Sequence, residues 1–245
     1  MISIVTFFWV DPARQRSYQI TPEDVRIWDS MVSRNVSVPH RRICVTHRPD
    51  LINFMETAPL DMAKHVPGTC LVKLQAHKPD AGLGGRILLM DVDCVVVGSL
   101  DPIVEDDTPV RLWANPNYVE GGRRGFYQGS MQLFTAGVTS FLWSDFCPKR
   151  DPAWLNRRFG GAEQCWISER LNTAYPAPGW AWDVPHFTEA DGVYGAGRLF
   201  GGKMGNGVTG ALPKNARIVF TPGDRAPSQP EFMAQHPWAR EFYHA

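Results

Sequence analysis

Two aspartates separated by one residue, Asp91 and Asp93, have the clearest chemical potential in this sequence. They interrupt an apolar, β-branched run from Arg86 to Gly98, which is typical of a buried strand. Side chains alternate along a strand, so both acids would point to one side unless the chain turns sharply between them. Two buried carboxylates repel each other and lose solvation unless a cation compensates them. The pattern predicts a divalent-metal site at the end of a strand, facing a cleft; the alternative is a tight turn between two strands, with both acids solvated.

Composition narrows the function classes. The chain has 245 residues, enough for one large domain with a substantial core. Its 25 basic and 25 acidic residues balance, and it has no basic block, which argues against nucleic acid or an anionic membrane surface as the main partner. The five cysteines include no Cys-x-x-Cys pair, which argues against a zinc knuckle or a disulfide framework. The apolar start lacks a basic leader, and no run reaches membrane-spanning length, so we expect a cytoplasmic protein without an integral membrane segment.

The first hundred residues alternate between strand and helix patterns. Thr21 followed by Pro22 and two acids is a strong helix start. The predicted elements are a strand at Ile2–Trp9, a helix from Pro22, a strand at Arg42–Thr46, mainly helix over 51–78 with a break at Pro67-Gly68, and the strand from Arg86. This order predicts parallel strands with helices on both faces. In such sheets ligands bind beyond the carboxyl ends of the strands, where the two aspartates lie.

The second half of the chain is less regular. We expect strands at Val110–Ala114, Met131–Phe134 and Ala216–Thr221, and helices at Thr139–Phe146, Ala162–Leu171 and Glu231–Tyr243. Residues 175–215 are rich in Gly, Pro and Trp with little periodicity, which is typical of a functional loop. No linker divides the chain, so we expect one domain over 1–245.

The apolar strand ending in Asp91-Val92-Asp93 resembles the metal-binding signature of GT-A glycosyltransferases, especially the galactosyltransferase-like family that includes glycogenin. Further similar segments follow the family's order: Leu71-Val72-Lys73-Leu74, Tyr127–Phe134, Gly161-Ala162-Glu163-Gln164 and Ala216–Gly223. The resemblance covers most of the chain. It implies an α/β GT-A (Rossmann-like) fold with a mixed, mainly parallel sheet flanked by helices. Residues 1–102 would then form the nucleotide-binding half and 103–245 the acceptor-side half.

The resemblance also implies a reaction. A sugar would move from a nucleotide-sugar donor, UDP-linked in this family, to a glycan or other small acceptor. Mn²⁺ or Mg²⁺ held by carboxylates would neutralise the leaving diphosphate. Asp93 would be the principal metal ligand, and Asp91 would bind the metal or the ribose or sugar. The donor would also contact Val92 of the same motif.

Other roles follow from the same resemblance. Glu163 would stabilise an oxocarbenium-like state and Gln164 would orient sugar or acceptor hydroxyls, although Glu163 could instead cap a helix. Arg86 would approach the donor's phosphates or sugar, or be a surface charge where the strand begins. The base would be contacted by residues at the end of the first strand, for which core packing is the alternative: Thr6, Phe7 and Trp9.

The sequence also departs from the family. The histidine that usually closes the metal site after the last strand is missing, because Pro222 precedes Gly223. Asp224, His236 or water would have to replace it. The family's Asn-Ser-Gly reads Gln-Gly-Ser here, and its Asp-Gln reads Glu-Gln. These changes leave the donor sugar and the stereochemical outcome open.

Two other functions remain open. A haloacid-dehalogenase-type phosphatase also uses Asp-x-Asp after an apolar strand, with Asp91 as nucleophile and Asp93 as general acid. That motif normally opens its domain, whereas here it follows ninety residues. A non-catalytic sugar-nucleotide or glycan-binding protein with the same fold would fit the missing histidine and the many tryptophans.

Overall fold

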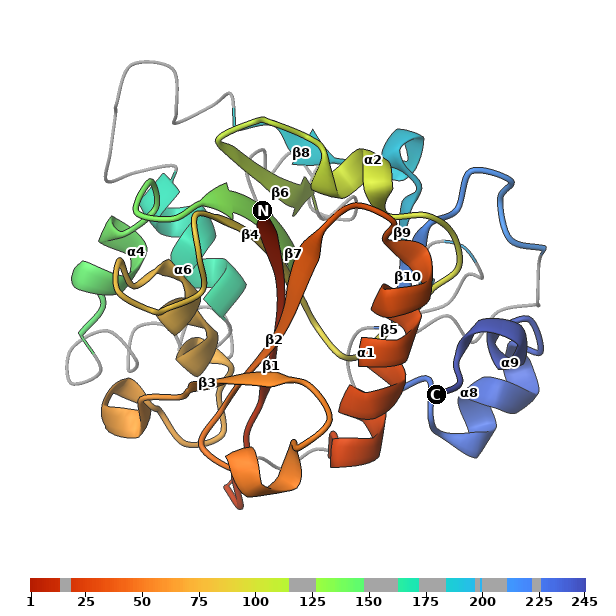
Figure 1. Ribbon diagram of the computed structural model, residues 1–245, viewed down its shortest axis with the longest axis horizontal. Helices are drawn as coiled ribbons and strands as arrows, with labels where there is room; N and C mark the ends of the chain where they lie inside the picture. Colours follow the sequence, from red (N-terminus) through yellow and green to blue (C-terminus); the bar gives the residue numbers. More distant parts are fainter. Residues whose placement is uncertain are drawn as a thin grey trace.

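The computed structural model describes residues 1–13, 19–114, 127–147, 163–171, 184–196, 199, 211–221 and 226–245. Its centre is a seven-stranded sheet (Figure 1). In spatial order the strands are β3 (Glu56–Pro59), β2 (His40–Thr46), β1 (Ile2–Phe8), β4 (Arg86–Met90), β7 (Tyr127–Thr135), β6 (Val110–Ala114) and β8 (His186–Phe187). Only β7 among these runs against the others. The expected mixed, mainly parallel sheet is therefore confirmed.

A second, three-stranded sheet adjoins the first. It consists of β5 (Cys94–Val96), β10 (Ile218–Phe220) and β9 (Val193–Gly195), with β10 in the middle. The strand β10 is antiparallel to β5 and parallel to β9. Because β5 begins four residues after β4 ends, the chain passes from one sheet to the other through the Asp91–Asp93 segment.

Two apolar layers cover the faces of the large sheet. One contains residues of α1 (Pro22–Asn35), the small sheet, α8 (Pro230–Gln235) and α9 (Ala239–Phe242). The other contains residues of η3 (Leu71–His77), α4 (Phe141–Ser144) and α6 (Glu163–Glu169). Figure 1 shows these groups on opposite sides of the strands. The remaining described helices are short: η1 (Pro49–Leu51), η2 (Met62–Lys64), α2 (Asp101–Val104) and η5 (Glu189–Asp191).

The helix start predicted at Thr21 is confirmed in detail. The Thr21 hydroxyl accepts a hydrogen bond from the Asp24 backbone N–H, and the Asp24 carboxylate accepts one from the Thr21 N–H at 2.7 Å. This capping box satisfies two N–H groups that the helix itself cannot. Tyr243 donates its hydroxyl to Asp24 Oδ1 at 2.9 Å, so the same buried carboxylate also anchors the C-terminal helices to α1.

The prediction of mainly helix over 51–78 was wrong. The segment contains the edge strand β3, whose residues pair in parallel with β2, and its helical parts are the short 3-10 helices η2 and η3. The strand is only four residues long and ends at Pro59. A proline is tolerated on an edge strand because no further strand needs its missing N–H. Such a short element carries too little periodicity to be recognised.

Three expected helices differ in extent. The helix expected at Thr139–Phe146 is only Phe141–Ser144, and the one expected at Ala162–Leu171 is described as Glu163–Glu169. The helix expected at Glu231–Tyr243 is divided into α8 and α9 at Pro237, which has no N–H to donate and disfavours helical geometry before it. The described part of 175–215 is not wholly irregular, since it contains β8, η5 and β9.

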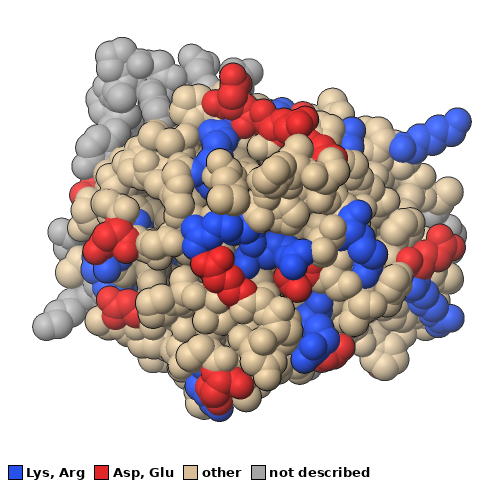
Figure 2. Space-filling view, in the orientation of Figure 1, with Lys and Arg blue, Asp and Glu red and all other residues tan. Residues whose placement is uncertain are grey.

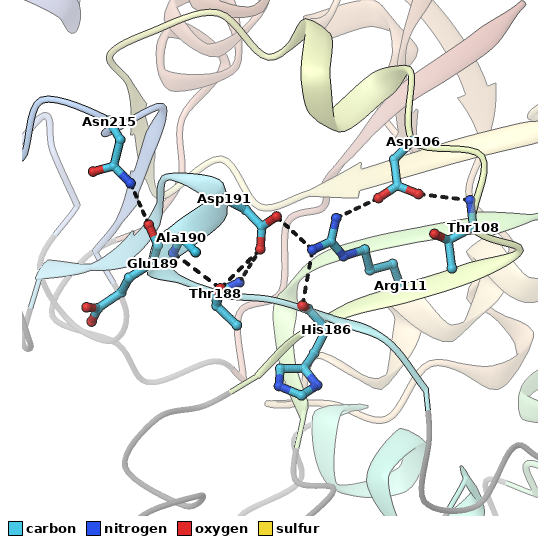
Figure 3. A network of polar contacts seen from close by, with 9 residues as sticks. All are labelled: Asp106, Thr108, Arg111, His186, Thr188, Glu189, Ala190, Asp191 and Asn215. Carbon is cyan, nitrogen blue, oxygen red and sulfur yellow. Dashed lines mark hydrogen bonds and ion pairs between the residues drawn. The ribbon is translucent and has the colours of Figure 1, made fainter.

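Arg111 of β6 connects the turn after α2 to the segment between β8 and β9 (Figure 3). Its guanidinium lies 2.6 Å from Asp106 Oδ2 and 2.7 Å from Asp191 Oδ1. It also lies 4.4 Å above the ring of Phe187. Asp191 in turn accepts from the Thr188 backbone N–H. These contacts fix the segment that leads from β8 in the large sheet to β9 in the small sheet.

The described surface is mixed in charge. Figure 2 shows lysine and arginine side chains next to aspartate and glutamate side chains over the face in view. Among the described helices, none is both long and apolar enough to cross a membrane.

His77, in η3, predicts how stability depends on pH. It is fully buried, with Nδ1 2.8 Å from Thr139 Oγ1 and its ring 4.5 Å from that of Phe134. Burial lowers the pKa of His77 from 6.5 to about 4. Below pH 6.5 His77 is protonated in the unfolded state but stays neutral in the folded state. The free energy of unfolding therefore decreases as the pH falls toward 4. Between pH 7.5 and pH 5 we expect His77 to account for a loss of about 2 kcal/mol.

Urea unfolding of the wild type and of His77→Gln at the two pH values measures the contribution of His77 to the pH dependence of stability. The variant should lose correspondingly less stability on acidification than the wild type. His244→Gln, at an exposed position, is the control and should behave as the wild type does. Equal pH dependence in His77→Gln and the wild type would contradict the assignment.

Candidate functional site

Asp91 and Asp93 lie between β4 and β5. The Asp91 N–H still donates to the Ser130 carbonyl at 2.9 Å, as an extension of the β4–β7 ladder. The chain then turns, with the Cys94 N–H 2.8 Å from the Val92 carbonyl. The alternation of side chains along one strand therefore does not apply here, and the tight turn between two strands is the arrangement found. Both aspartates are partly exposed.

The turn is held in place from the small sheet. Thr221, the residue after β10, donates both its backbone N–H (2.9 Å) and its hydroxyl (3.0 Å) to the carbonyl oxygen of Asp93. Thr221 is itself buried. The peptide of Asp93 is thus fixed by two donors, while Asp91 is fixed by the large sheet.

A buried lysine lies beside the turn. Lys73 Nζ is 2.8 Å from Asp91 Oδ1 and 3.1 Å from Asp91 Oδ2, and it also pairs with Glu163 Oε1. The side chains of Lys73 and Glu163 are only 5% and 4% exposed, and that of Asp91 is 21% exposed. Burial by itself would lower the pKa of Lys73, but the charges of Asp91 and Glu163 outweigh it and raise that pKa above its ordinary value. The ammonium is therefore a permanent counter-charge between two carboxylates.

The helix η3 places this ammonium through a series of buried polar contacts. All seven of its residues are buried. Gln75 donates to the Pro59 carbonyl and accepts from the Asp61 N–H, both at 2.7 Å, which attaches η3 to the end of β3. His77, two residues further along and the last residue of the helix, contacts Thr139. Lys73 precedes both attachments in the same buried helix, and its ammonium reaches Asp91 and Glu163.

Glu163 and Gln164 open α6 and lie against Gly129 of β7. A Cβ added at Gly129 would overlap Glu163 Oε1 and lie 2.8 Å from its Cδ. The Gly129 N–H donates to Gln164 Oε1 at 3.4 Å. The helix is anchored further along by Trp166, whose indole N–H donates to the Leu142 carbonyl at 2.8 Å. The structure thus places Glu163 against Lys73, which also pairs with Asp91, and Gln164 against the Gly129 backbone.

The residues expected to contact the base and the donor are more buried. Thr6 and Phe7 are buried in β1, Phe7 as part of one apolar layer, and Val92 is 2% exposed. The burial of Thr6 and Phe7 fits the core-packing alternative stated for them. Trp9 is only partly buried and follows the carboxyl end of β1, where a nucleotide could reach it.

Arg86 lies far from the aspartates along the strand. It is the first residue of β4, whereas Asp91 follows the last. Its guanidinium donates to Thr135 Oγ1 at 3.2 Å and to the Asp106 carbonyl. The structure does not bring Arg86 together with Lys73, Asp91 and Glu163.

A polar contact beyond the carboxyl end of β1 was missed from the sequence. Asp11, in the loop after β1, accepts from the Gly68 N–H at 2.7 Å and lies 3.2 Å from His65 Nε2. Its side chain is 4% exposed. Gly68 has φ +77, a left-handed backbone that glycine adopts without strain. The contact joins the end of β1 to the segment leading into η3.

Two of the carboxylates expected to bind a metal, those of Asp91 and Asp93, lie among the described residues. Within the described ranges, no group of three His, Cys, Asp or Glu side chains is arranged to hold a metal ion. Of the suggested replacements for the missing histidine, Asp224 lies outside the described residues. His236 is buried between α8 and α9, with its ring 4.5 Å from that of Phe232 and 6.1 Å from that of Trp238. Asp91 and Asp93 remain as the described candidate ligands.

Comparison with known proteins gives information on the fold. No protein-family model matches this sequence, and no curated protein matches it either. Among solved structures, the galactosyltransferase LgtC in complex with donor and acceptor sugar analogues is similar with a TM-score of 0.58 and 10% sequence identity. The match covers 99% of this chain and 97% of that one. The chain therefore has a GT-A glycosyltransferase-like fold, as its sequence motifs led us to expect.

Proposed function

We propose that this protein is a metal-dependent glycosyltransferase that takes its sugar from a nucleotide-sugar donor, UDP-linked as the family resemblance implies. One observation carries the proposal. Lys73 joins the Asp-x-Asp turn to the catalytic candidate Glu163 at the carboxyl edge of a GT-A-like sheet. Ligands of open α/β sheets bind at this edge. The similar galactosyltransferase, crystallised with donor and acceptor sugar analogues, adds support from the fold.

The chemistry of the turn fits a hard divalent cation. Asp91 and Asp93 supply carboxylate oxygens, the ligands that Mn²⁺ and Mg²⁺ prefer, and both side chains are partly exposed. These two residues would hold the ion. Such an ion neutralises the charge that develops on a departing diphosphate.

The chain's own residues would handle the sugar. Glu163 would supply the carboxylate that stabilises positive charge at the glycosyl centre, and Gln164 would supply an amide that binds sugar or acceptor hydroxyls. Lys73 compensates both Asp91 and Glu163, so each is held in one position before the substrate arrives. Trp9 is the described residue at the end of β1 that could contact the base.

The first prediction concerns donor binding. UDP should raise the melting temperature only when Mn²⁺ is also present, because its diphosphate needs the ion held by Asp91 and Asp93. At a ligand concentration 100 times Kd, the expected stabilisation is about 2.7 kcal/mol. Thermal unfolding with UDP, GDP and CDP, each with and without Mn²⁺, measures this.

Two variants sharpen the test. Asp93→Asn should abolish the metal-dependent shift, whereas Asp107→Asn, at an exposed position, should leave it unchanged. Incubation with UDP-sugars should release UDP in a metal-dependent way. A shift without UDP release would indicate a binding protein, and no metal-dependent shift with any nucleotide would contradict the proposal.

The second prediction concerns Lys73. Lys73→Met removes the counter-charge and leaves Asp91 and the buried Glu163 uncompensated, so the free energy of unfolding should fall by about 3–5 kcal/mol. Lys73→Met/Glu163→Gln should recover part of this loss, because one of the two stranded charges is then gone. Urea unfolding at neutral pH measures both.

Lys78→Met is the matched control. Lys78 follows the same helix and pairs with the exposed Asp80. Its loss should change stability by less than about 0.5 kcal/mol. If Lys73→Met were no more destabilising than Lys78→Met, the buried ion pairs of Lys73 would not stabilise the fold, contrary to this prediction.

A further inference from the structure

Gly129 occupies an unusual position for a glycine. It lies in the interior of β7, is buried, and has no positive φ that would demand glycine. A glycine inside a strand weakens it, and one reason for its presence is the close approach of another group. Here the approaching group is the carboxylate of Glu163.

The space left by the missing side chain is filled by that carboxylate. A Cβ at position 129 would overlap Glu163 Oε1, lie 2.8 Å from Cδ and lie 3.4 Å from Cγ. The carboxylate is buried and pairs with Lys73 on its other side. It therefore cannot move away from a larger residue at 129 without leaving its ion pair.

The length of Glu163 matters for the same reason. An aspartate at 163 would carry its carboxylate one methylene, about 1.5 Å, closer to the helix. It would withdraw from both Gly129 and Lys73. The glycine therefore has a steric purpose only when the facing acid is a glutamate.

We propose that Gly129 is a positioning residue: it admits the longer acid at 163 and so sets where the reacting carboxylate lies. Residues 129 and 163 then form a size-coupled pair, in which glycine requires glutamate and a larger residue requires aspartate. The Gly129 N–H donates to Gln164 Oε1, so the same residue also holds the side chain that follows Glu163 against β7. The catalytic part of this inference rests on the proposed function; the steric part does not.

A double-mutant cycle tests the pair. Gly129→Ala should lower kcat about 100-fold, the effect expected when a catalytic group is displaced by about 1 Å, with a smaller change in the KM for the donor. Glu163→Asp should also lower kcat. The double variant Gly129→Ala/Glu163→Asp should be at least about tenfold faster than Gly129→Ala, because the shorter acid removes the overlap. Independent losses that simply multiply would overturn the proposal.

Thermal unfolding of the same proteins gives a readout that needs no activity. Gly129→Ala should lower Tm in the wild-type background, and it should lower Tm much less when Glu163→Ala has already removed the carboxylate. Gly85→Ala is the control, since a Cβ at Gly85 meets nothing within 4 Å. If Gly129→Ala fails to fold, recovery of folding in Gly129→Ala/Glu163→Ala supports the steric pair and its absence overturns it. If no nucleotide-sugar is turned over by the wild type, the proposed function fails while the unfolding data still decide the steric claim.

Discussion

The ammonium of Lys73 between the carboxylates of Asp91 and Glu163 is the interaction on which the candidate site depends. Two acids brought together with little solvent repel each other and lose hydration. A buried cation with good hydrogen-bond geometry removes that penalty, and it also restricts where each acid can lie. In this protein the cation joins elements from distant parts of the sequence: η3, the turn between β4 and β5, and the first residue of α6. The ion pairs of Lys73 therefore hold these three elements together at the candidate site.

The topology of the large sheet makes this meeting possible. The carboxyl ends of β1 and β4 lie side by side because the strands are parallel neighbours. The reversed strand β7 brings its early residues to the same edge, where Met131 pairs with Met90 and the Ser130 carbonyl accepts from Asp91. Gly129 is therefore presented to α6 at the level of the Asp-x-Asp turn. A parallel strand in this position would have placed its early residues at the opposite edge.

Much of this could be predicted from the sequence where the signals are local. The capping box at Thr21 and the apolar strands β1 and β4 follow from short patterns, and the ordered motifs indicated the GT-A-like fold. Lys73 belongs to one of the family-like segments, but its role at the site does not follow from the sequence, because its partners lie 18 and 90 positions further along the chain. The Asp11–His65 contact was missed for the same reason. Arg86 was expected near the donor because it starts the motif strand, yet a strand carries its first and last residues to opposite edges of a sheet.

The most direct test of the central claim is ¹⁵N NMR of lysine ammonium groups at neutral pH, in the metal-free protein. Buried, hydrogen-bonded ammonium protons exchange slowly enough with water to be observed, whereas exposed ones do not. We expect a protected ammonium signal that is absent from Lys73→Met and that shows hydrogen-bond couplings to the side-chain carboxyl carbons of both Asp91 and Glu163. A Lys73 ammonium that exchanges as fast as exposed lysines, or one coupled to neither carboxylate, would contradict the account.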